Sequence, residues 1–261
     1  RRGLPLTTYS AEALAAVGAS FPVVFLAVAL AAGLSMGCNV VISQLFVAHR
    51  VREVKVTIST ALLGQFFLSL AIMIAGGLLS PAILRLLKTP ANIMADSRTY
   101  LQIYFCGAVF LFIYNTLNGI YNALGDSKTP LYFLMVSSVL NIGLDFLFIV
   151  NFGLGVMGAA LATVLSQAVS GVCCFLYIAK KYPVLRLSKK DFRWDFKIAA
   201  KHMGIGLPMA FQFSITAIGV IVLQGAINLF GESRIAAYAA ASKVEQLVSQ
   251  PAGTFGVTMA N

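Results

Sequence analysis

The chain has 261 residues, of which 59% are hydrophobic and only 11% are charged, and its formal net charge is +10. Soluble domains carry roughly 25% charged residues, and a soluble protein of this size would need far more polar surface to cover its core. The composition therefore excludes an ordinary soluble domain, and the absence of segments that alternate with period two excludes a membrane β-barrel.

Apolar stretches with few or no charges follow one another along the chain, each about long enough for a membrane helix, which takes about 20 residues. They predict seven membrane spans, at 17–46, 57–84, 99–122, 131–150, 156–179, 203–230 and from about 235 onwards. Polar turns and basic loops separate these stretches. The sequence therefore predicts an all-α, polytopic helical membrane protein.

The basic residues are concentrated in alternate loops. The loops at 50–55, 128 and 180–201 hold 12 Lys and Arg residues, whereas the opposite set of loops holds 7. Because cytoplasmic loops carry the excess of Lys and Arg, we expect the first set to face the cytoplasm and the protein to lie in the cytoplasmic membrane. The net charge then reports topology, and we expect no nucleic-acid partner.

The basic linker 180–202 contains a second pattern. Phe192, Phe196, Ala199 and Met203 fall on one helical face, and basic residues occupy the other faces. This pattern predicts an amphipathic helix that lies on the inner leaflet, either as an interfacial connector or as a lipid sensor.

Asp145 lies inside the apolar run 131–150, and Asn141 precedes it by four residues, which puts both side chains on one face of a helix. An ionised carboxylate in the membrane costs about 2.5–3.5 kcal/mol on insertion scales, so such residues usually serve a pathway, a proton relay or an ion site. The alternative is an acid near the end of its span that reaches water. Together with Thr163 on the next span, these side chains offer oxygen ligands for Na⁺ or hydrogen bonds to a protonatable carboxyl.

Other polar side chains occur inside the predicted spans. Asn115 and Asn118 lie too deep for the membrane interface and should face protein or water, because lipid offers amides no partner. Tyr100 fits either a pocket or an interfacial aromatic belt. Gln212 and Glu245 suggest a second polar site lining a cavity, although Glu245 would also fit a simple interfacial ion pair.

No motif points to catalysis. His49 and His202 lie in basic loops without an evident partner, and the four cysteines lie in apolar runs without metal-ligand spacing. The string Gly153-x-Gly155-x-x-Gly158 matches a dinucleotide fingerprint, but it lies between membrane spans and lacks the acid expected about twenty residues later. We expect a tight turn there, followed by small-residue helix packing. We also expect no enzyme activity, no cofactor, and no metal beyond a possible Na⁺ at Asp145.

A faint internal repeat relates residues 11–20 to 233–242, and residues 33–37 to 256–260. Six predicted spans separate the two copies, so both would have the same orientation in the membrane. Parallel repeats around a central site are a transporter architecture. On this interpretation the chain is a fragment that lacks the first helix of the first repeat and most of the second.

Several stretches resemble the multidrug and toxic compound extrusion (MATE) family of antiporters. The central ones are Gly-x-x-Asn-Ala-Leu-Gly-Asp-Ser-Lys-Thr-Pro at 119–130, Asn141-x-x-x-Asp145, and Gly-Val-Met-Gly-Ala-Ala-Leu-Ala-Thr-Val-Leu-Ser-Gln at 155–167. The segments 11–18 and 235–245 are similar to the family as well. The resemblance implies twelve helices in two six-helix lobes, related by a pseudo-two-fold around a cleft, of which this chain would be helices two to eight.

The resulting domain assignment has three parts. They are an amino-terminal lobe without its first helix (1–185, five spans), the basic cytoplasmic linker (186–202), and the start of the carboxy-terminal lobe (203–261, two spans).

The resemblance also implies an antiporter, coupled to H⁺ or Na⁺, that exports organic and often cationic compounds by alternating access. It implies a small-molecule substrate, a lipid environment and a full-length monomer as the working unit. In family members with a cation site in the amino-terminal lobe, that site uses an Asn and an Asp at this spacing on the fifth helix and a Thr on the sixth. Asn141, Asp145 and Thr163 match those positions.

The same family cavity is lined by polar residues of the fourth helix. Tyr100, Asn115 and Asn118 fall where those residues would be. The site's other acid lies on the first helix, which this chain lacks.

Two other functions stay open at the level of the sequence. A lipid-linked sugar flippase would need several Arg or Lys residues facing the cavity, and the predicted spans contain none before Lys243. A membrane enzyme would need a catalytic pair at the inner face. A non-transporting subunit would leave Asp145 without a role.

Overall fold

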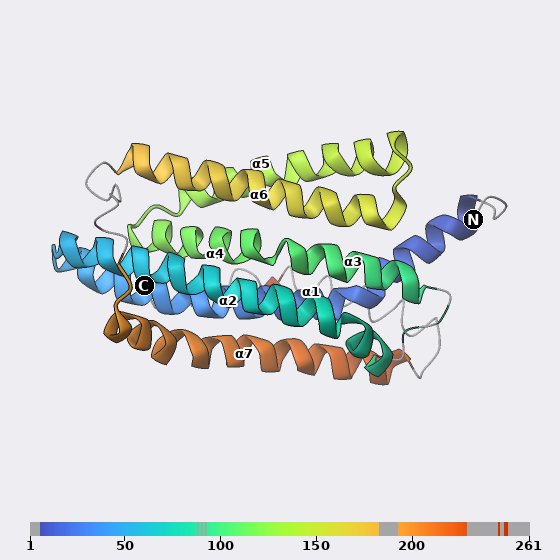
Figure 1. Ribbon diagram of the computed structural model, residues 1–261, viewed down its shortest axis with the longest axis horizontal. Helices are drawn as coiled ribbons and strands as arrows, with labels where there is room; N and C mark the ends of the chain where they lie inside the picture. Colours follow the sequence, from blue (N-terminus) through green and yellow to red (C-terminus); the bar gives the residue numbers. More distant parts are fainter. Residues whose placement is uncertain are drawn as a thin grey trace.

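The computed structural model describes residues 6–87, 89, 91, 93–182, 193–228, 245, 248 and 249. Within these residues the regular structure is helical, and no strand occurs. The long helices lie side by side with their axes roughly parallel (Figure 1). The prediction of an all-α fold is confirmed.

The helices α1 (Leu6–Val47) and α2 (Val51–Leu86) form an antiparallel pair. The turn between them contains His49 with φ 56°, a left-handed conformation that is uncommon outside glycine. α1 packs against α2, α3, α4, α6 and α7, and most extensively against α7.

The third predicted span, 99–122, is two helices instead of one: α3 (Met94–Cys106) and α4 (Ala108–Ala123), bent by 49° relative to each other. The break occurs at Gly107, where a Cβ atom would lie 2.4 Å from Cγ2 of Val164 on α6 (Gly155–Lys181). The absence of a side chain thus lets the backbone approach α6 closely at the bend. If this pair counts as one span, the predicted span at 99–122 is bent at Gly107.

The turn after α4 is closed by Gly125, whose φ is 76°. The amide of Gly125 donates to the carbonyl of Asn122, and the amide of Asp126 donates to the carbonyl of Tyr121. This is the Schellman pattern, which favours glycine at the left-handed position. The chain then enters α5 (Lys128–Asp145), which continues as a short π-helical segment, η1 (Phe146–Asn151).

The turn between η1 and α6 contains two glycines with positive φ, Gly153 at 63° and Gly155 at 55°. A Cβ on Gly158 would lie 3.0 Å from the Cβ of Phe148, which is closer than ordinary van der Waals contact. The tight turn and the close helix packing predicted from the glycine string are therefore confirmed.

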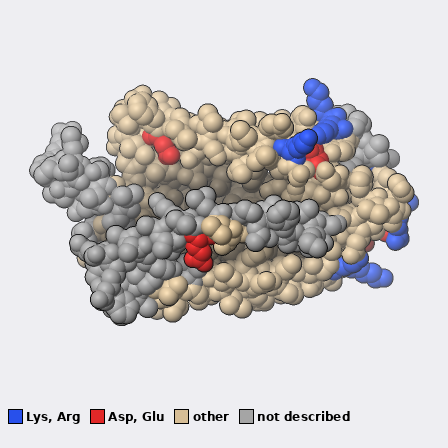
Figure 2. All heavy atoms as spheres, turned by 180° about the vertical axis from the view of Figure 1, so that it is seen from behind, with Lys and Arg blue, Asp and Glu red and all other residues tan. Residues whose placement is uncertain are grey.

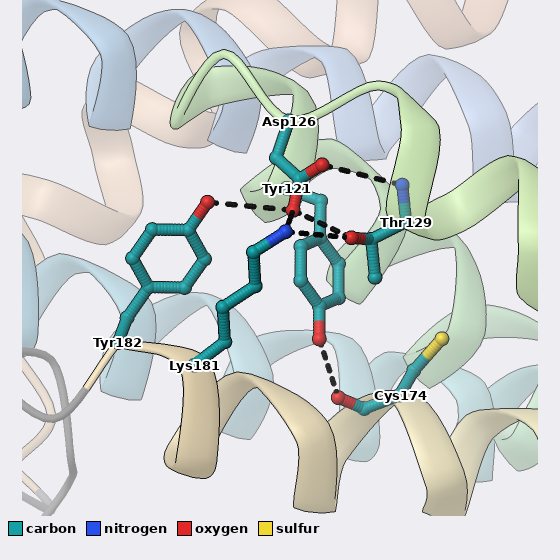
Figure 3. Close-up of polar contacts among 6 residues, drawn as sticks. All are labelled: Tyr121, Asp126, Thr129, Cys174, Lys181 and Tyr182. Atoms are coloured by element: carbon teal, nitrogen blue, oxygen red, sulfur yellow. Dashed lines mark hydrogen bonds and ion pairs between the residues drawn. The ribbon is translucent and has the colours of Figure 1, made fainter.

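A polar cluster ties the start of α5 to the end of α6 (Figure 3). Lys181 Nζ lies 2.6 Å from Asp126 Oδ2 and 3.0 Å from Thr129 Oγ1. The Thr129 amide and hydroxyl donate to the two Asp126 oxygens at 3.2 and 2.6 Å, and the Tyr182 hydroxyl lies 3.3 Å from Oδ2. Burial alone would raise the Asp126 pKa, but the hydrogen bonds from Lys181 and Thr129 outweigh it and the pKa is lowered.

Helix α7 (Phe196–Asn228) starts seven residues before the predicted sixth span, so the last part of the predicted interfacial helix is the beginning of this long helix. Asp195 caps it, since its Oδ1 accepts from the amides of Lys197 (2.8 Å) and Ile198 (3.1 Å). The rest of the linker, including Phe192, lies outside the described residues, as do most of the last predicted span and the second copy of the repeat.

The packing of α7 on α1 depends on small residues. A Cβ on Gly33 would lie 2.3 Å from the Cα of Ala210, and one on Gly37 would lie 2.4 Å from the carbonyl oxygen of His202. A Cβ on Gly206 would lie 3.0 Å from the carbonyl oxygen of Leu34. Gly33 and Gly37 on α1 face Gly206 and Ala210 on α7, so each helix contributes two small residues four positions apart. We call this contact the α1/α7 seam.

Four described helices are long and apolar enough to cross a membrane, or five if the bent pair α3 and α4 counts as one span. Many of their large apolar side chains are exposed, which fits a lipid environment. Most of the described Lys and Arg residues visible in Figure 2 gather at one end of the helices. The chain is therefore a multi-pass membrane protein.

Candidate functional site

Asp145 is the last residue of α5, directly before the π-helical segment η1. π-helical turns are rare and are found frequently at functional sites. Asp145 and Asn141 are both half-buried. The Oδ1 atom of Asp145 and the Nδ2 atom of Asn141 are buried without a hydrogen-bond partner among the described residues.

Unpartnered buried polar atoms are unusual, because each costs about 1–3 kcal/mol. Two of them lie four residues apart on α5, where they could form hydrogen bonds to a further group. A carboxylate oxygen and an amide group suit a hydrated cation, a proton with a water molecule, or a polar ligand.

Thr163 lies on α6, the helix against which α5 packs. Its hydroxyl donates to the carbonyl of Ala159 at 3.0 Å, which leaves the lone pairs of the oxygen free to accept or to coordinate. Tyr100 on α3 is buried and stacks on Tyr104 with ring centroids 6.4 Å apart. Tyr100 also lies close enough to Asp145 to interact with it electrostatically. α3 and α5 both pack against α6, so the helices that carry these residues are neighbours.

Asn115 and Asn118 lie in a different place from Asp145. They line a pocket of about 160 Å³ between α1, α4 and α7. Its walls are Ala32, Ser35, Met36, Asn39, Asn115, Asn118, Gly119, Asn122 and Phe213. Tyr100 is not among them.

Hydrogen bonds organise this asparagine pocket. Asn115 Nδ2 donates to the carbonyl of Leu111 at 2.8 Å, and Asn122 Nδ2 donates to Asn118 Oδ1 at 3.2 Å. The Ser35 hydroxyl donates to the carbonyl of Asn115, which connects α1 to α4. The pocket thus presents amide groups and no charged side chain among the residues that line it.

Sequence reasoning missed two asparagines of this pocket, Asn39 and Asn122. A helical spacing was the available signal. Asn115, Asn118 and Asn122 follow one another at three and four residues, which places them on one face of α4. Ser35 and Asn39 have the same relation on α1.

The remaining predicted cavity residues, Gln212 and Glu245, are exposed. Gln212 lies on α7, and Glu245 is one of three residues that the structure describes after Asn228. Neither lines the pocket of the asparagines.

His202 differs from its predicted place in a basic loop. It lies inside α7 and is only 6% exposed, because the α1/α7 seam covers it. No group of three or more His, Cys, Asp or Glu side chains in the described part of the chain is arranged to hold a metal ion. The four cysteines form no disulfide, and Cys38 and Cys174 are buried.

Comparisons with known proteins place the chain among transporters. A model of the MatE family matches residues 5–147. The probable multidrug resistance protein YoeA of Bacillus subtilis is 30% identical over 255 residues, which are 95% of this chain and 55% of that protein. The multidrug export protein MepA of Staphylococcus aureus (strain MRSA252) is 24% identical, over 89% of this chain and 52% of that protein.

Solved structures agree with the sequence comparison. An inward-facing multidrug resistance MATE family transporter of the MOP superfamily has a TM-score of 0.82 at 28% identity, covering 92% of this chain and 55% of that one. A MOP superfamily transporter from Pyrococcus furiosus has a TM-score of 0.84 at 27% identity, covering 94% and 55%. The chain thus spans about half the length of the relatives that it matches.

Proposed function

The chain belongs to the MatE family, and from this premise we propose that the protein carrying it exports organic, drug-like compounds across the cytoplasmic membrane, in exchange for H⁺ or Na⁺. The family consists of transporters and not of enzymes, and the relatives above are named for multidrug resistance or export. The substrate, the coupling ion and the alternating-access mechanism are our inference for this chain.

One observation carries the coupling proposal: Asp145 and Asn141 each bury a polar atom that has no partner among the described residues. On this proposal Asp145 takes up the cation from the outside. Asn141 and Thr163 supply further oxygen atoms, and the phenol of Tyr100 lies within electrostatic range of the carboxylate. Neutralising the carboxylate removes the cost of a buried charge and changes how α5, α6 and α3 pack.

The driving force is sufficient for such a cycle. One elementary charge that crosses a potential of 100 mV releases about 2.3 kcal/mol. Substrate expulsion then follows from the repacking around α6, and the empty carrier returns by the reverse transition. Amide-lined walls without charged side chains, such as those of the asparagine pocket, would discriminate little between substrates. Such low selectivity suits the export of varied hydrophobic cations.

The test is efflux of a fluorescent cationic dye from cells that make the full-length protein, as wild type and as Asp145→Asn. We expect wild-type cells to export the dye and Asp145→Asn cells to lose export while the variant still inserts in the membrane. Glu53→Gln makes the same chemical change at the exposed turn where Glu53 pairs with Arg50, and it should leave export intact.

Equal export by wild type and Asp145→Asn would contradict the role of Asp145 and leave drug export standing. No dye export by the wild type would contradict drug export itself and would favour a lipid-linked substrate. Repeating the assay with Na⁺ replaced by K⁺, and with the pH gradient collapsed, separates the two coupling ions.

A further inference from the structure

A second pocket lies at the α1/α7 seam, and the proposed function does not use it. Its volume is about 130 Å³, and helices α1, α2 and α7 together with Trp194 enclose it. The lining residues are Leu34, Cys38, Thr60, Ala61, Gly64, Gln65, Leu68, Trp194, Ala199, His202 and Met203. We call it the histidine pocket.

His202 is the polar centre of this pocket. Its Nδ1 atom lies 3.9 Å from the Sγ atom of Cys38 on α1. Its Nε2 atom is buried and has no hydrogen-bond partner among the described residues, and the same holds for Oε1 of Gln65. His202 and Gln65 are each only 6% exposed, and Cys38 is 1% exposed.

The surroundings of His202 provide no counter-charge. Cys38 is the only other titratable side chain that lines the pocket, and α2 contributes the neutral side chains of Thr60 and Gln65. Lys201, the next residue on α7, points to Gln44, whose Oε1 accepts from Nζ at 3.2 Å. Asp195 is engaged in capping α7.

If the seam opened at the end of the helices where the pocket lies, protons would reach the pocket from that side of the membrane. The segment 193–195 covers it and is held on α2, because the amide of Arg193 donates to Ser59 Oγ at 3.2 Å and the amide of Asp195 donates to Thr60 Oγ1 at 3.3 Å. This end carries the basic turns that predict the cytoplasmic face. The backbone of His202 contacts Gly37, so His202 belongs to the contact between α1 and α7 that must separate when the seam opens.

We propose that His202 is a proton-binding site of the α1/α7 seam, neutral while the seam is closed and protonated from the cytoplasmic side when the seam opens. Closure removes the imidazole from water without offering it an anion, and this disfavours the imidazolium form. Opening restores hydration and permits protonation. By linkage, acidification of the cytoplasm then favours the open seam, by up to about tenfold per pH unit for one proton.

The inference rests on the proposed alternating access, since it assumes that α1 and α7 separate at this end. Its ligand is a proton on the inner side. Asp145 is the last residue of α5, which packs against neither α1 nor α7, so the two sites are tested separately.

Cys38 supplies the reporter, because the closed seam buries it against His202. Inside-out vesicles with the full-length protein are treated with N-ethylmaleimide at pH 7.5 and pH 5.5, and modification of the Cys38 peptide is followed by mass spectrometry. Each rate is divided by the rate of the same peptide in protein unfolded with sodium dodecyl sulfate. This ratio removes the pH dependence of the thiol chemistry.

We expect the normalised rate at Cys38 to rise at least fivefold from pH 7.5 to pH 5.5 in the wild type. His202→Asn, whose amide nitrogen can replace Nδ1 but cannot titrate in this range, should show no rise. His49→Asn, at the exposed histidine of the turn between α1 and α2, should retain the full rise.

A flat wild-type ratio would overturn the proposal without any variant, and so would a full rise in His202→Asn. The labelling does not require transport. A protein that exports dye but shows no rise therefore refutes the proton site alone, whereas a protein that exports no dye refutes the proposed function alone.

Discussion

Helices α1 and α5 are almost equally apolar, yet they occupy opposite environments. α1 packs against five other helices and buries residues from Ala16 to Ile42. α5 packs mainly on α6, and its buried residues are only Thr129 and Pro130 at its start. Side chains such as Val139, 72% exposed, can only meet lipid or a part of the protein outside this chain.

The difference shows that similarly apolar helices can be stabilised either by packing against other helices or by exposing apolar side chains to lipid. The small residues of α1 allow backbone contact with α7, so that helix is held by close packing. The large residues of α5 cover its outer face, while Ser137, Asn141 and Asp145 are half-buried. Asp145 and Asn141 thus lie on a helix that packs mainly against one neighbour, and on our proposal this helix repacks when a cation binds.

The largest effect should come from breaking the close packing of α1. Gly33→Ala places a methyl group 2.3 Å from the Cα of Ala210, where only backbone atoms could yield. We expect the free energy of unfolding to fall by about 3 kcal/mol. The measurement is the thermal unfolding midpoint of the purified protein in detergent.

Gly18→Ala is the matched control on the same helix, because no atom lies within 4 Å of its would-be Cβ. It should be neutral or slightly stabilising, since alanine favours helix over glycine. If Gly33→Ala and Gly18→Ala lowered the unfolding midpoint equally, close packing at the α1/α7 seam would not be the cause of the loss.

A smaller effect should come from the polar cluster that attaches α5. Asp126→Ala removes the acceptor for the Thr129 amide and hydroxyl as well as the partner of Lys181 (Figure 3). We expect a loss of about 2 kcal/mol, most of it from the lost helix cap. Asp126→Asn retains an acceptor and should lose less than half as much in the same assay. A larger loss in Asp126→Asn would mean that the charge, and not the cap, holds α5.

A single buried hydrogen bond between α4 and α6 should matter less. The Tyr121 hydroxyl donates to the carbonyl of Cys174 at 2.8 Å, and Tyr121→Phe removes it without creating a cavity. We expect a loss of about 1 kcal/mol. Tyr132→Phe makes the same change at a side chain of α5 that is 65% exposed and should leave the unfolding midpoint unchanged. An unchanged unfolding midpoint in Tyr121→Phe would show that this hydrogen bond does not stabilise the packing of α6 on α4.

The smallest expected effect is a dependence on acid pH. The Asp126 pKa lies below its ordinary value of 3.8, so the ionised carboxylate stabilises the folded state above that pH. This contribution is lost as the pH falls through the lower pKa of the folded state. The difference in unfolding midpoint between the wild type and Asp126→Asn should therefore be constant from pH 7 to pH 5 and shrink below pH 3.8. A difference that persists unchanged at pH 2.5 would contradict this account.

The sequence by itself determined the membrane class, the helical fold and most helix positions, because those depend on the length and spacing of apolar runs and on glycines in turns. Gly125, Gly153 and Gly155 predicted turns that the structure has, since only glycine adopts positive φ at no cost. The pairing of Asn141 with Asp145 also followed from spacing along one helix. These properties are local, so neighbouring residues suffice to state them.

Tertiary structure alone decided which helices meet. The bend at Gly107 depends on Val164, which is 57 residues away in the chain, and the burial of His202 depends on Gly37 and Cys38 of another helix. The four asparagines of the pocket come from two helices whose contact no hydropathy pattern encodes. A lipid-facing apolar helix and a protein-facing one have the same hydropathy, because lipid and protein interior are both apolar. Only the packing distinguishes α5, which carries the proposed cation site, from α1, which holds the structure together.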